Sequence, residues 1–330
     1  MTLRLFVCEF VTGGGLCGQP LPPGLAREGE AMLRALVKDL LDLPGLELVS
    51  TRDARLPESD LPMHFEAVVR ADAVWPLWRR LIEESDAFWP IAPESGGVLE
   101  RLSRMATDQG RVLFGSAPAA VRVAASKRAT AQHLIARGLP AVPCLDAVDL
   151  ERRADGWVVK PDDGAGCLDT RFVGNAAAIP AVLADRDCVV QPCLDGPSAS
   201  LSLLCQDGDA WLLSYNRQDV ELSNGVFRYR GCMVGTAPES GADYAALARQ
   251  VVAALPGLWG YVGVDMLETR DGPVIVEINP RLTTSYIGLR ESLGRNPAAF
   301  VLALRTQALA AVRCRLAPRP VAVAVEGVHA

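Results

Sequence analysis

The sequence predicts an α/β unit followed by an α+β part. Over residues 1–115, short apolar runs surround a strongly amphipathic helical pattern, which is typical of an open, mostly parallel sheet with flanking helices. Farther along the chain, pairs of apolar runs are joined by short turns that contain Asp-Gly, which is typical of antiparallel hairpins. We therefore expect an open, mostly parallel sheet with flanking helices at the amino-terminal end, followed by a part that contains antiparallel hairpins.

The first unit begins with a buried strand at residues 3–10. The segment 16–24 contains three prolines and two glycines and therefore cannot be helical. A helix follows it, because apolar residues recur at helical spacing and form one stripe. The stripe consists of Met32, Leu33, Leu36, Val37, Leu40 and Leu41. Further strands are expected at 46–50, 67–69, 87–91 and 112–115.

The second part opens with a short helix at 126–137, which Gly138 and Pro140 close. Residues 201–216 are expected to form a hairpin around an Asp-Gly turn. The polar, glycine-containing segment 219–235 is expected to be a long mobile loop. Other strands are expected at 157–160, 188–194, 260–268 and 273–279.

Composition excludes several classes of function. The 330 residues carry a net charge of −6, which argues against nucleic acid or an anionic membrane as the main partner. No apolar run approaches the length of a membrane-spanning helix. The nine cysteines are scattered without a CxxC pair, and the three histidines complete no metal-ligand spacing. We therefore expect a reduced, cytoplasmic protein without structural zinc.

Gly13, Gly15 and Gly18 form a GxGxxG pattern directly after the first strand. A dinucleotide site requires the third glycine to open a helix whose amino terminus holds the pyrophosphate. The three prolines that follow forbid that helix, which argues against a dinucleotide site. A GxxxxGK[ST] phosphate loop does not occur in the sequence.

A better candidate for a phosphate site is the segment 160–167, Lys-Pro-Asp-Asp-Gly-Ala-Gly-Cys. A lysine on a strand supplies a compact charge for phosphate oxygens, and glycines let backbone N–H groups approach an anion closely. Ordinary surface turns also carry Asp and Gly. This segment alone therefore leaves both interpretations open.

Asp265, Glu277 and Asn279 are the strongest candidates for chemistry. Glu277 and Asn279 share one face of a strand, and a three-residue loop would place Asp265 across from Glu277, with β-carbons ~5 Å apart. Two carboxylates among such apolar neighbours repel each other unless a cation joins them. Oxygen-only ligands suit Mg²⁺, so the three residues predict phosphoryl chemistry without a P-loop. A solvated sheet face that carries two acids is the alternative.

At this point four stretches, in order and at suitable spacing, resemble the ATP-grasp enzymes. They are the lysine helix from Ser126-Lys127 to Pro140, the strand and glycines after Val158, the hinge at 191–196, and the strands with Asp265 and 277–281. The resemblance covers about residues 1–310 and implies an ATP-grasp fold with a Rossmann-like pre-ATP-grasp domain. It divides the chain into a substrate domain (1–115), a linker with the lysine helix (116–156), a small lid subdomain (157–197), a metal-binding subdomain (198–312) and a tail (313–330).

Within this family, five stretches resemble the tyramine–glutamate ligases of methanofuran biosynthesis and their bacterial methylofuran relatives. The stretches are 9–15, 27–29, 91–94, 216–218 and 279–286. The resemblance implies an ATP-dependent carboxylate–amine ligase that joins L-glutamate to tyramine or tyrosine through an acyl phosphate. The alternatives are another amino-acid or peptide ligase of the family, or a nucleotide-binding member with degraded catalysis.

The resemblance also implies roles for individual residues. Lys127 and Lys160 would neutralise the phosphates of ATP. One or two Mg²⁺ ions, or Mn²⁺ in their place, would lie on Asp265, Glu277 and Asn279. The other nucleotide-binding residues would be Gly164, Gly166, Cys167, Gln191, Pro192, Cys193, Leu194 and Ser198. The catalytic residues would be Lys160, Arg217 and Arg281, with Arg281 facing the transferred phosphate.

Acids of the amino-terminal unit suit an ammonium group of the substrate. Glu9 and Glu94 follow the carboxyl ends of strands, where open α/β sheets bind ligands. Glu28 lies four residues before Met32 and therefore on the inward apolar face of the first helix. Arg217, Arg228, Arg230 and Arg281 suit the carboxylates of glutamate. We expect an amino acid and an amine as small-molecule partners, with a homodimer as one option, and a structural role is the alternative for each of these residues.

Three positions depart from the family pattern. Gln191 stands where many members have a glutamate, and Ser198 stands where an acid often holds the ribose. Gly263 stands where many amino-acid ligases have an arginine. The two lysines and three metal ligands are retained, which favours an active enzyme.

Overall fold

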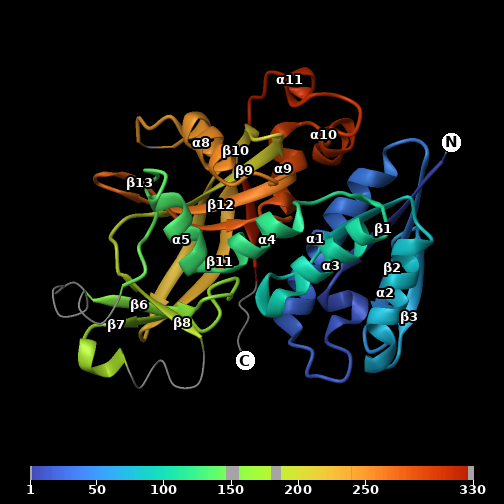
Figure 1. Ribbon diagram of the computed structural model, residues 1–330, viewed down its shortest axis with the longest axis horizontal. Coiled ribbons are helices and arrows are strands. Elements are labelled where there is room, and N and C mark those ends of the chain that lie inside the picture. The colour runs from blue at the N-terminus through green and yellow to red at the C-terminus, as the bar shows by residue number, and fades with distance from the viewer. Residues whose placement is uncertain (1, 146–155, 180–186, 239, 326–330) are drawn as a thin grey trace.

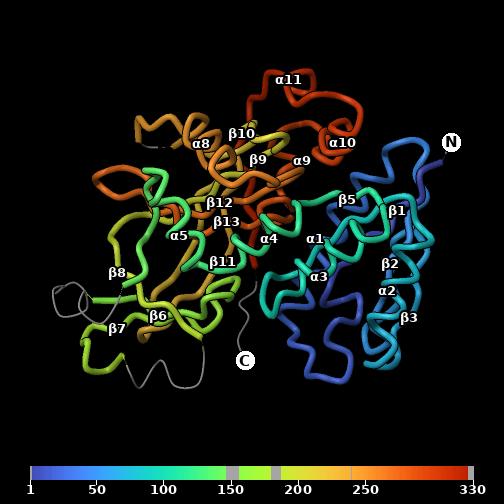
Figure 2. The backbone as a smooth tube through the Cα atoms, viewed as in Figure 1, coloured from blue at the N-terminus to red at the C-terminus, as the bar shows by residue number. Residues whose placement is uncertain are grey.

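The computed structural model describes residues 2–145, 156–179, 187–238 and 240–325. The expected linker at 116–156 and the expected tail at 313–330 therefore lie partly outside the described residues. Figure 1 shows the amino-terminal domain on one side, a large sheet in the centre and a group of short strands on the other side. The tube in Figure 2 shows helix α4 (Pro118–Ala125) where the chain crosses from the first domain to the second.

The amino-terminal domain is built on a five-stranded sheet with the order β3-β2-β1-β4-β5, in which every pairing is parallel. This arrangement confirms the expected open parallel sheet. The last expected strand, 112–115, is only two residues long. The strands are β1 (Leu3–Glu9), β2 (Leu46–Asp53), β3 (His64–Val68), β4 (Ala87–Ile91) and β5 (Val112–Leu113).

Helices cover both faces of this sheet because successive side chains of β1 point in opposite directions. Leu5 and Val7 pack in the same core as helix α1, whereas Phe6 and Cys8 pack with α2 and α3. Helix α1 begins at Pro23, so the expectation that 16–24 is non-helical is wrong for its last two residues, because proline is tolerated in the first turn of a helix. Gly18 opens no helix. The helices and short turns are α1 (Pro23–Leu41), α2 (Val74–Glu83), α3 (Val98–Asp108), η1 (Val11–Gly15), η2 (Ala71–Ala73) and η3 (Ser95–Gly97).

The second part contains a curled antiparallel sheet with the order β13-β12-β9-β10-β11-β7-β6-β8, and β14 pairs with β11. The expected tail thus contributes a strand to this sheet. The strands are β6 (Trp157–Pro161), β7 (Arg171–Val173), β8 (Cys188–Pro192), β9 (Ser198–Gln206), β10 (Asp209–Ser223), β11 (Val226–Val234), β12 (Gly260–Thr269), β13 (Gly272–Asn279) and β14 (Val321–Ala324).

Two layers of helices enclose the large sheet. Helices α4, α5 and α8 share one apolar core with it, and helices α9 and α10 share another core that also contains α1. Helix α1 is therefore packed between the parallel sheet and the second domain. The helical elements are α5 (Lys127–Ile135), η4 (Ala176–Ala178), α8 (Tyr244–Ala254), α9 (Tyr286–Leu293), α10 (Pro297–Ala303) and α11 (Leu309–Val312). Among the described residues, none of these helices combines the length and apolar character needed to cross a bilayer.

The expectation of a mobile loop at 219–235 is wrong. This segment forms the end of β10 and all of β11, which pair antiparallel around the two-residue turn Asn224-Gly225. Both turn residues have positive φ, +52° and +74°, as the tight hairpin turn favoured by Asn-Gly requires. Polar residues alternate with apolar ones along these two strands, which are largely half-buried, and this alternation was the signal for a hairpin.

The hairpin of β12 and β13 confirms that Asp265 lies opposite Glu277, but by a different route. The turn has two residues, not three, which alone would pair Asp265 with Val276. A bulge between Asp265 and Met266 shifts the register by one residue. The bulge therefore brings the two carboxylates face to face.

Candidate active site

A cavity of about 310 Å³ lies between the small strands and the hairpin of β12 and β13. One wall is formed by β6, β8 and the glycine loop, which we define as residues 161–167. The opposite wall is formed by β12, β13 and the segment 281–285. Glu28 of helix α1 also lines the cavity, so the amino-terminal domain contributes to it.

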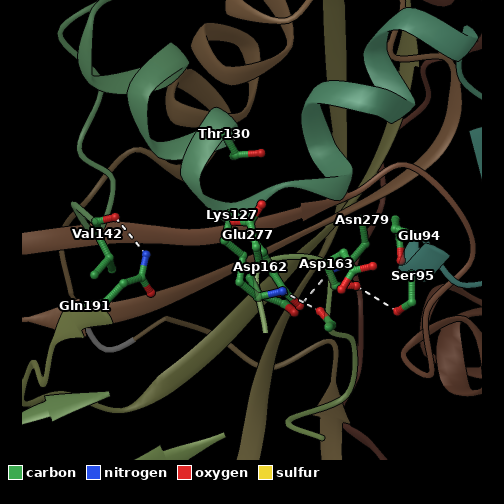
Figure 3. Close-up of polar contacts among 12 residues, drawn as sticks. Glu94, Ser95, Lys127, Thr130, Val142, Asp162, Asp163, Gln191, Glu277 and Asn279 are labelled. Carbon is green, nitrogen blue, oxygen red and sulfur yellow. Dashed lines mark hydrogen bonds and ion pairs between the residues drawn. The ribbon is translucent and has the colours of Figure 1, made fainter. Parts of the chain in front are cut away.

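Two lysines meet two carboxylates in this cavity. Lys127 and Lys160 are only 6% and 7% exposed, and both line the cavity with Asp265 and Glu277. The Nζ of Lys127 lies 3.2 Å from Glu277 Oε2 (Figure 3). Lys127 opens helix α5, where the Ser126 side chain caps the helix by accepting from Ala129 N–H at 3.0 Å. Sequence positions 127, 160 and 277 are thus brought to one place by three different elements.

The crowding of charges shifts the pKa of each group. Burial and the adjacent Glu277 carboxylate raise the pKa of Asp265 well above its usual range. Burial also acts on Glu277, but Lys127 and Lys160 outweigh it and lower the pKa of Glu277. Burial, together with the charge of Lys127, lowers the pKa of Lys160 to about 8. The two lysines therefore stabilise the Glu277 carboxylate, whereas at Asp265 burial and Glu277 outweigh the opposing effect of Arg281 on the pKa.

The facing carboxyl groups of Asp265 and Glu277 fit a divalent metal ion. Asn279 Nδ2 donates to Asp265 Oδ2 at 3.1 Å, and Gln218 Nε2 donates to Oδ1 at 3.0 Å. Across the described part of the chain, no cluster of three His, Cys, Asp or Glu side chains could hold a metal ion. Two carboxylates and one amide oxygen suit a hard cation that takes its remaining ligands from water and phosphate. Asp265, Glu277 and Asn279 are therefore the residues that would hold it.

The predicted nucleotide residues all line the same cavity. Lys127 Nζ donates to the Gly164 carbonyl, which ties the glycine loop to helix α5. Burial raises the pKa of the Cys167 thiol to about 12, so this thiol supplies no thiolate nucleophile. The loop and hinge residues that line the cavity are Gly164, Gly166, Cys167, Gln191, Pro192, Cys193, Leu194 and Ser198.

Gln191, one of the departures from the family pattern, is almost fully buried on β8. Its Nε2 donates to the Val142 carbonyl at 3.0 Å, as Figure 3 shows. An amide can make this bond, whereas a glutamate carboxylate would need a proton to do so. The glutamine therefore fits its own surroundings in this chain.

Gly263, another position that departs from the family pattern, lies where a larger side chain would be crowded. A Cβ at this position would lie 2.7 Å from Thr283 Cγ2. Arg281 lines the cavity instead, and its guanidinium is held by three hydrogen bonds of 2.9–3.1 Å from Nε and Nη2 to the Glu94 carboxylate. The cavity therefore contains an arginine from position 281 and none from position 263.

The three acids predicted to contact an ammonium group lie in different surroundings. Glu28 lines the cavity, and burial raises its pKa while Arg281 opposes the shift. Glu94 is buried in its ion pair with Arg281. Glu9 does not line the cavity: its carboxylate accepts from Val11 N–H and from the N–H and hydroxyl of Thr12, and it packs against Gly29. Of these three acids, only Glu28 lines the cavity.

The arginines predicted on β10 and β11 lie outside the cavity. Arg217 is exposed, because its neighbour Gln218 takes the inward position and successive side chains of a strand alternate. Arg230 lies at the bulge of the hairpin and forms an ion pair with Glu221. The structure therefore does not place Arg217 or Arg230 with the substrate residues.

Gln218 and Tyr229 line the cavity and were missed from the sequence. The Tyr229 hydroxyl lies 2.8 Å from Thr284 Oγ1. Alternation along a hairpin centred on Asn224-Gly225 would have placed both side chains on one face. The expectation of a loop at 219–235 concealed that signal.

Comparison with known proteins gives two matched families. Residues 124–285 match the ATP-grasp domain family, and residues 46–121 match the pre-ATP-grasp 3 domain family. The chain is 24% identical over 261 residues to tyramine–L-glutamate ligase of Methanocaldococcus jannaschii, which covers 78% of this chain and 71% of that protein. It is 25% identical to tyramine–L-glutamate ligase of Methanocaldococcus fervens, over 81% of this chain and 84% of that protein.

Solved structures share the fold. An ATP-grasp superfamily protein from Archaeoglobus fulgidus superposes with a TM-score of 0.70 at 25% identity, covering 92% of this chain and 88% of that one. L-amino acid ligase from Bacillus licheniformis superposes with a TM-score of 0.66 at 18% identity, covering 92% and 73%. The expected fold, a Rossmann-like domain followed by this curled sheet, is confirmed.

Proposed function

We propose that this chain, which belongs to the ATP-grasp family, joins L-glutamate to tyramine or tyrosine in methanofuran or methylofuran biosynthesis. ATP-grasp carbon–nitrogen ligases are enzymes, and their fold binds ATP and uses a divalent metal ion. The observation that carries the proposal is the meeting of Lys127, Lys160, Asp265 and Glu277 in one cavity that Glu28 and Arg281 also line. The two named relatives support glutamate and tyramine as the substrates.

In the first half-reaction, a glutamate carboxylate oxygen attacks the γ-phosphorus of ATP, ADP leaves, and an acyl phosphate forms. Lys127 and Lys160 bind phosphate oxygens, and Arg281 faces the transferred group. Asp265, Glu277 and Asn279 would hold a divalent ion, which would supply charge neutralisation on the phosphates. The chain supplies no covalent nucleophile, so positioning and electrostatics account for the rate.

In the second half-reaction, the amine attacks the acyl carbon and phosphate leaves with the C–O bonding electrons. Glu28 receives the ammonium group of the acceptor and can hold the proton that the amine loses before attack. Its raised pKa, which burial causes, suits a group that takes up a proton. The glycine loop covers the cavity wall beside Lys127 and excludes water from the acyl phosphate.

A ligase for another pair of substrates is the second candidate. The glycine at position 263 favours this alternative, because many amino-acid ligases of the family have an arginine there. Arg281 weakens the argument, because it brings an arginine to the cavity from another position. A protein with degraded catalysis is not favoured, since both lysines and all three metal ligands lie in the cavity.

The test is phosphate release and amide detection by mass spectrometry, with Mg-ATP, L-glutamate and a panel of amines that includes tyramine and tyrosine. We expect amide formation with glutamate and a phenolic amine. In Asp265→Asn we expect turnover to fall by about 100-fold or more. Asp271→Asn is the matched control, because Asp271 is an exposed acid on the turn of the same hairpin. Amide formation from a different carboxylate alone would contradict the substrates, and normal turnover of Asp265→Asn would contradict the site.

A further inference from the structure

A short turn of the amino-terminal domain touches both the arginine of the active site and the glycine loop. The turn Glu94–Gly96, which we call the 94–96 turn, follows β4 and precedes helix α3. Figure 3 shows Glu94 and Ser95 beside Asp163. Neither contact is local, since Arg281 and Asp163 are 187 and 67 positions away in sequence.

The first contact fixes Arg281. Glu94 and Arg281 have side chains that are 7% and 12% exposed, and the carboxylate accepts three hydrogen bonds from the guanidinium. A buried pair of this kind has one defined geometry, because breaking it leaves an uncompensated charge. The Arg281 guanidinium also donates to its own chain at the Leu282 carbonyl, at 3.0 Å. The head group therefore cannot turn without losing several bonds.

The second contact fastens the glycine loop. Gly96 N–H donates to Asp163 Oδ2 at 2.8 Å, and the Ser95 hydroxyl donates to the Asp163 carbonyl at 2.7 Å. Gly96 and Gly97 both have left-handed φ, +62° and +68°, and a Cβ at either would meet no atom within 4 Å. The glycines are therefore required by the backbone conformation that presents the Gly96 N–H, not by lack of space.

The residues on both sides of Asp163 hydrogen-bond to Lys127 of helix α5. The Asp162 carbonyl accepts from Lys127 N–H at 3.0 Å, and the Gly164 carbonyl accepts from Lys127 Nζ. Asp163 is therefore the residue through which a loop held by Lys127 reaches the amino-terminal domain. The 94–96 turn connects the loop that covers the phosphates to the arginine that faces them.

We propose that the 94–96 turn is a positioning element: Glu94 orients Arg281 toward the reacting phosphate, and Ser95 and Gly96 latch the glycine loop closed through Asp163. This inference rests on the proposed function and extends it to residues that contact neither substrate. Opening the latch exposes the acyl phosphate to water, which forms phosphate and free carboxylate in place of the amide. Each ATP consumed then yields less product.

The latch can be removed without separating the domains. Near the carboxyl-terminal end of helix α1, Asp39 accepts from the Tyr286 hydroxyl at 2.8 Å and from Arg290 at 3.0 Å, and helices α1, α9 and α10 share a core. The double variant Ser95→Ala/Asp163→Ala removes both latch bonds and leaves the contacts of helix α1 with α9 and α10 in place. Asp271→Ala, on an exposed turn, is the control.

The first measurement is backbone hydrogen exchange of residues 161–168 in the presence of Mg-ADP. We expect exchange about 10-fold faster or more in the double variant and unchanged exchange in Asp271→Ala, because the loop opens locally without global unfolding. Equal protection in native protein and double variant would overturn the latch. This outcome does not depend on which substrates the enzyme uses.

The second measurement is the ratio of ATP consumed to amide formed. We expect a ratio near 1 in the native chain and roughly 3 or more in the double variant, since water competes for the acyl phosphate. For Glu94→Gln we expect kcat to fall about 10–100-fold with the KM for ATP within about 2-fold, and Glu94→Asp to recover part of kcat. An unchanged ratio in the double variant, or native kcat in Glu94→Gln, would overturn the proposal. If the native chain forms no amide at all, the proposed function fails, while the exchange experiment still decides the latch.

Discussion

Replacing Asp265 by asparagine should stabilise the metal-free protein and lower its turnover by about 100-fold or more. The Asp265 and Glu277 carboxylates face each other across a hairpin within hydrogen-bonding distance, and Asp265 is buried. Two unit charges ~4 Å apart repel by about 4 kcal/mol at an effective dielectric constant of about 20. Asparagine removes that repulsion and keeps an oxygen that can accept from Gln218 or Asn279.

The expected gain is smaller than the full repulsion for two reasons. Lys127 lies 3.2 Å from Glu277 and already offsets part of the negative charge. Asp265, whose pKa burial and Glu277 raise, avoids part of the cost by holding a proton. We therefore expect a free energy of unfolding about 1–3 kcal/mol higher in the variant, which is a rise in Tm of roughly 2–6 °C.

The assay is thermal unfolding of the native chain, Asp265→Asn and the control Asp271→Asn, each in EDTA and in Mg-ADP. Native protein and control should gain stability from Mg-ADP, because a ligand that binds only the folded state raises Tm. Asp265→Asn should have a higher Tm than the native chain in EDTA, and Mg-ADP should raise that Tm only a little. A lower Tm of the variant in EDTA would refute the repulsion, and a full Mg-ADP shift in the variant would refute the metal assignment.

Three further predictions concern single residues. Glu28→Gln should lower turnover per acceptor concentration about 10–100-fold with unchanged ADP affinity, because a charge-assisted bond to ammonium is worth about 1.5–3 kcal/mol. The measurement is steady-state kinetics with the acceptor amine. Native kinetic values would contradict the substrate role and leave Glu28 as an acid that only stabilises the start of the helix. Lys160→Met should weaken ADP binding about 10-fold or more in calorimetry, since a buried point charge to phosphate is lost, and native affinity would contradict its role. Burial raises the pKa of Glu9 to about 7 from 4.5, so its contribution to stability is full at acidic pH and is lost as pH rises through 7. Urea unfolding should therefore show native stability falling by about 2–3 kcal/mol relative to Glu9→Gln between pH 5 and 8, and parallel pH profiles would contradict this.

Local patterns predicted the elements well where one physical cause dominates. The proline-rich segment 16–24 excluded a helix at Gly18, and helix α1 begins only at Pro23. The Asp-Gly turn at 207–208 predicted a hairpin, and both residues have positive φ there. At 219–235 polar composition concealed the alternation of a half-buried hairpin, so a strand pair was taken for a loop.

The candidate site was predictable in its metal and phosphate residues, but not in its substrate end. Asp265 and Glu277 lie on adjacent strands, where pairing rules apply even though the bulge was not foreseen. Arg217 and Gln218 are neighbours in sequence, and only the strand's orientation decides which faces the cavity. The Glu94–Arg281 pair joins two domains, and no short-range rule predicts a contact across 187 positions.

The central claim is that a substrate carboxylate attacks ATP to form an acyl phosphate in the cavity of Lys127, Lys160, Asp265 and Glu277. The direct test uses L-glutamate labelled with ¹⁸O in its carboxylates, together with the best acceptor amine and Mg-ATP. An acyl phosphate passes one carboxylate oxygen to phosphate when the amine displaces it. We predict one ¹⁸O atom in each released phosphate, matched to amide formed. Amide formation with unlabelled phosphate would contradict the account.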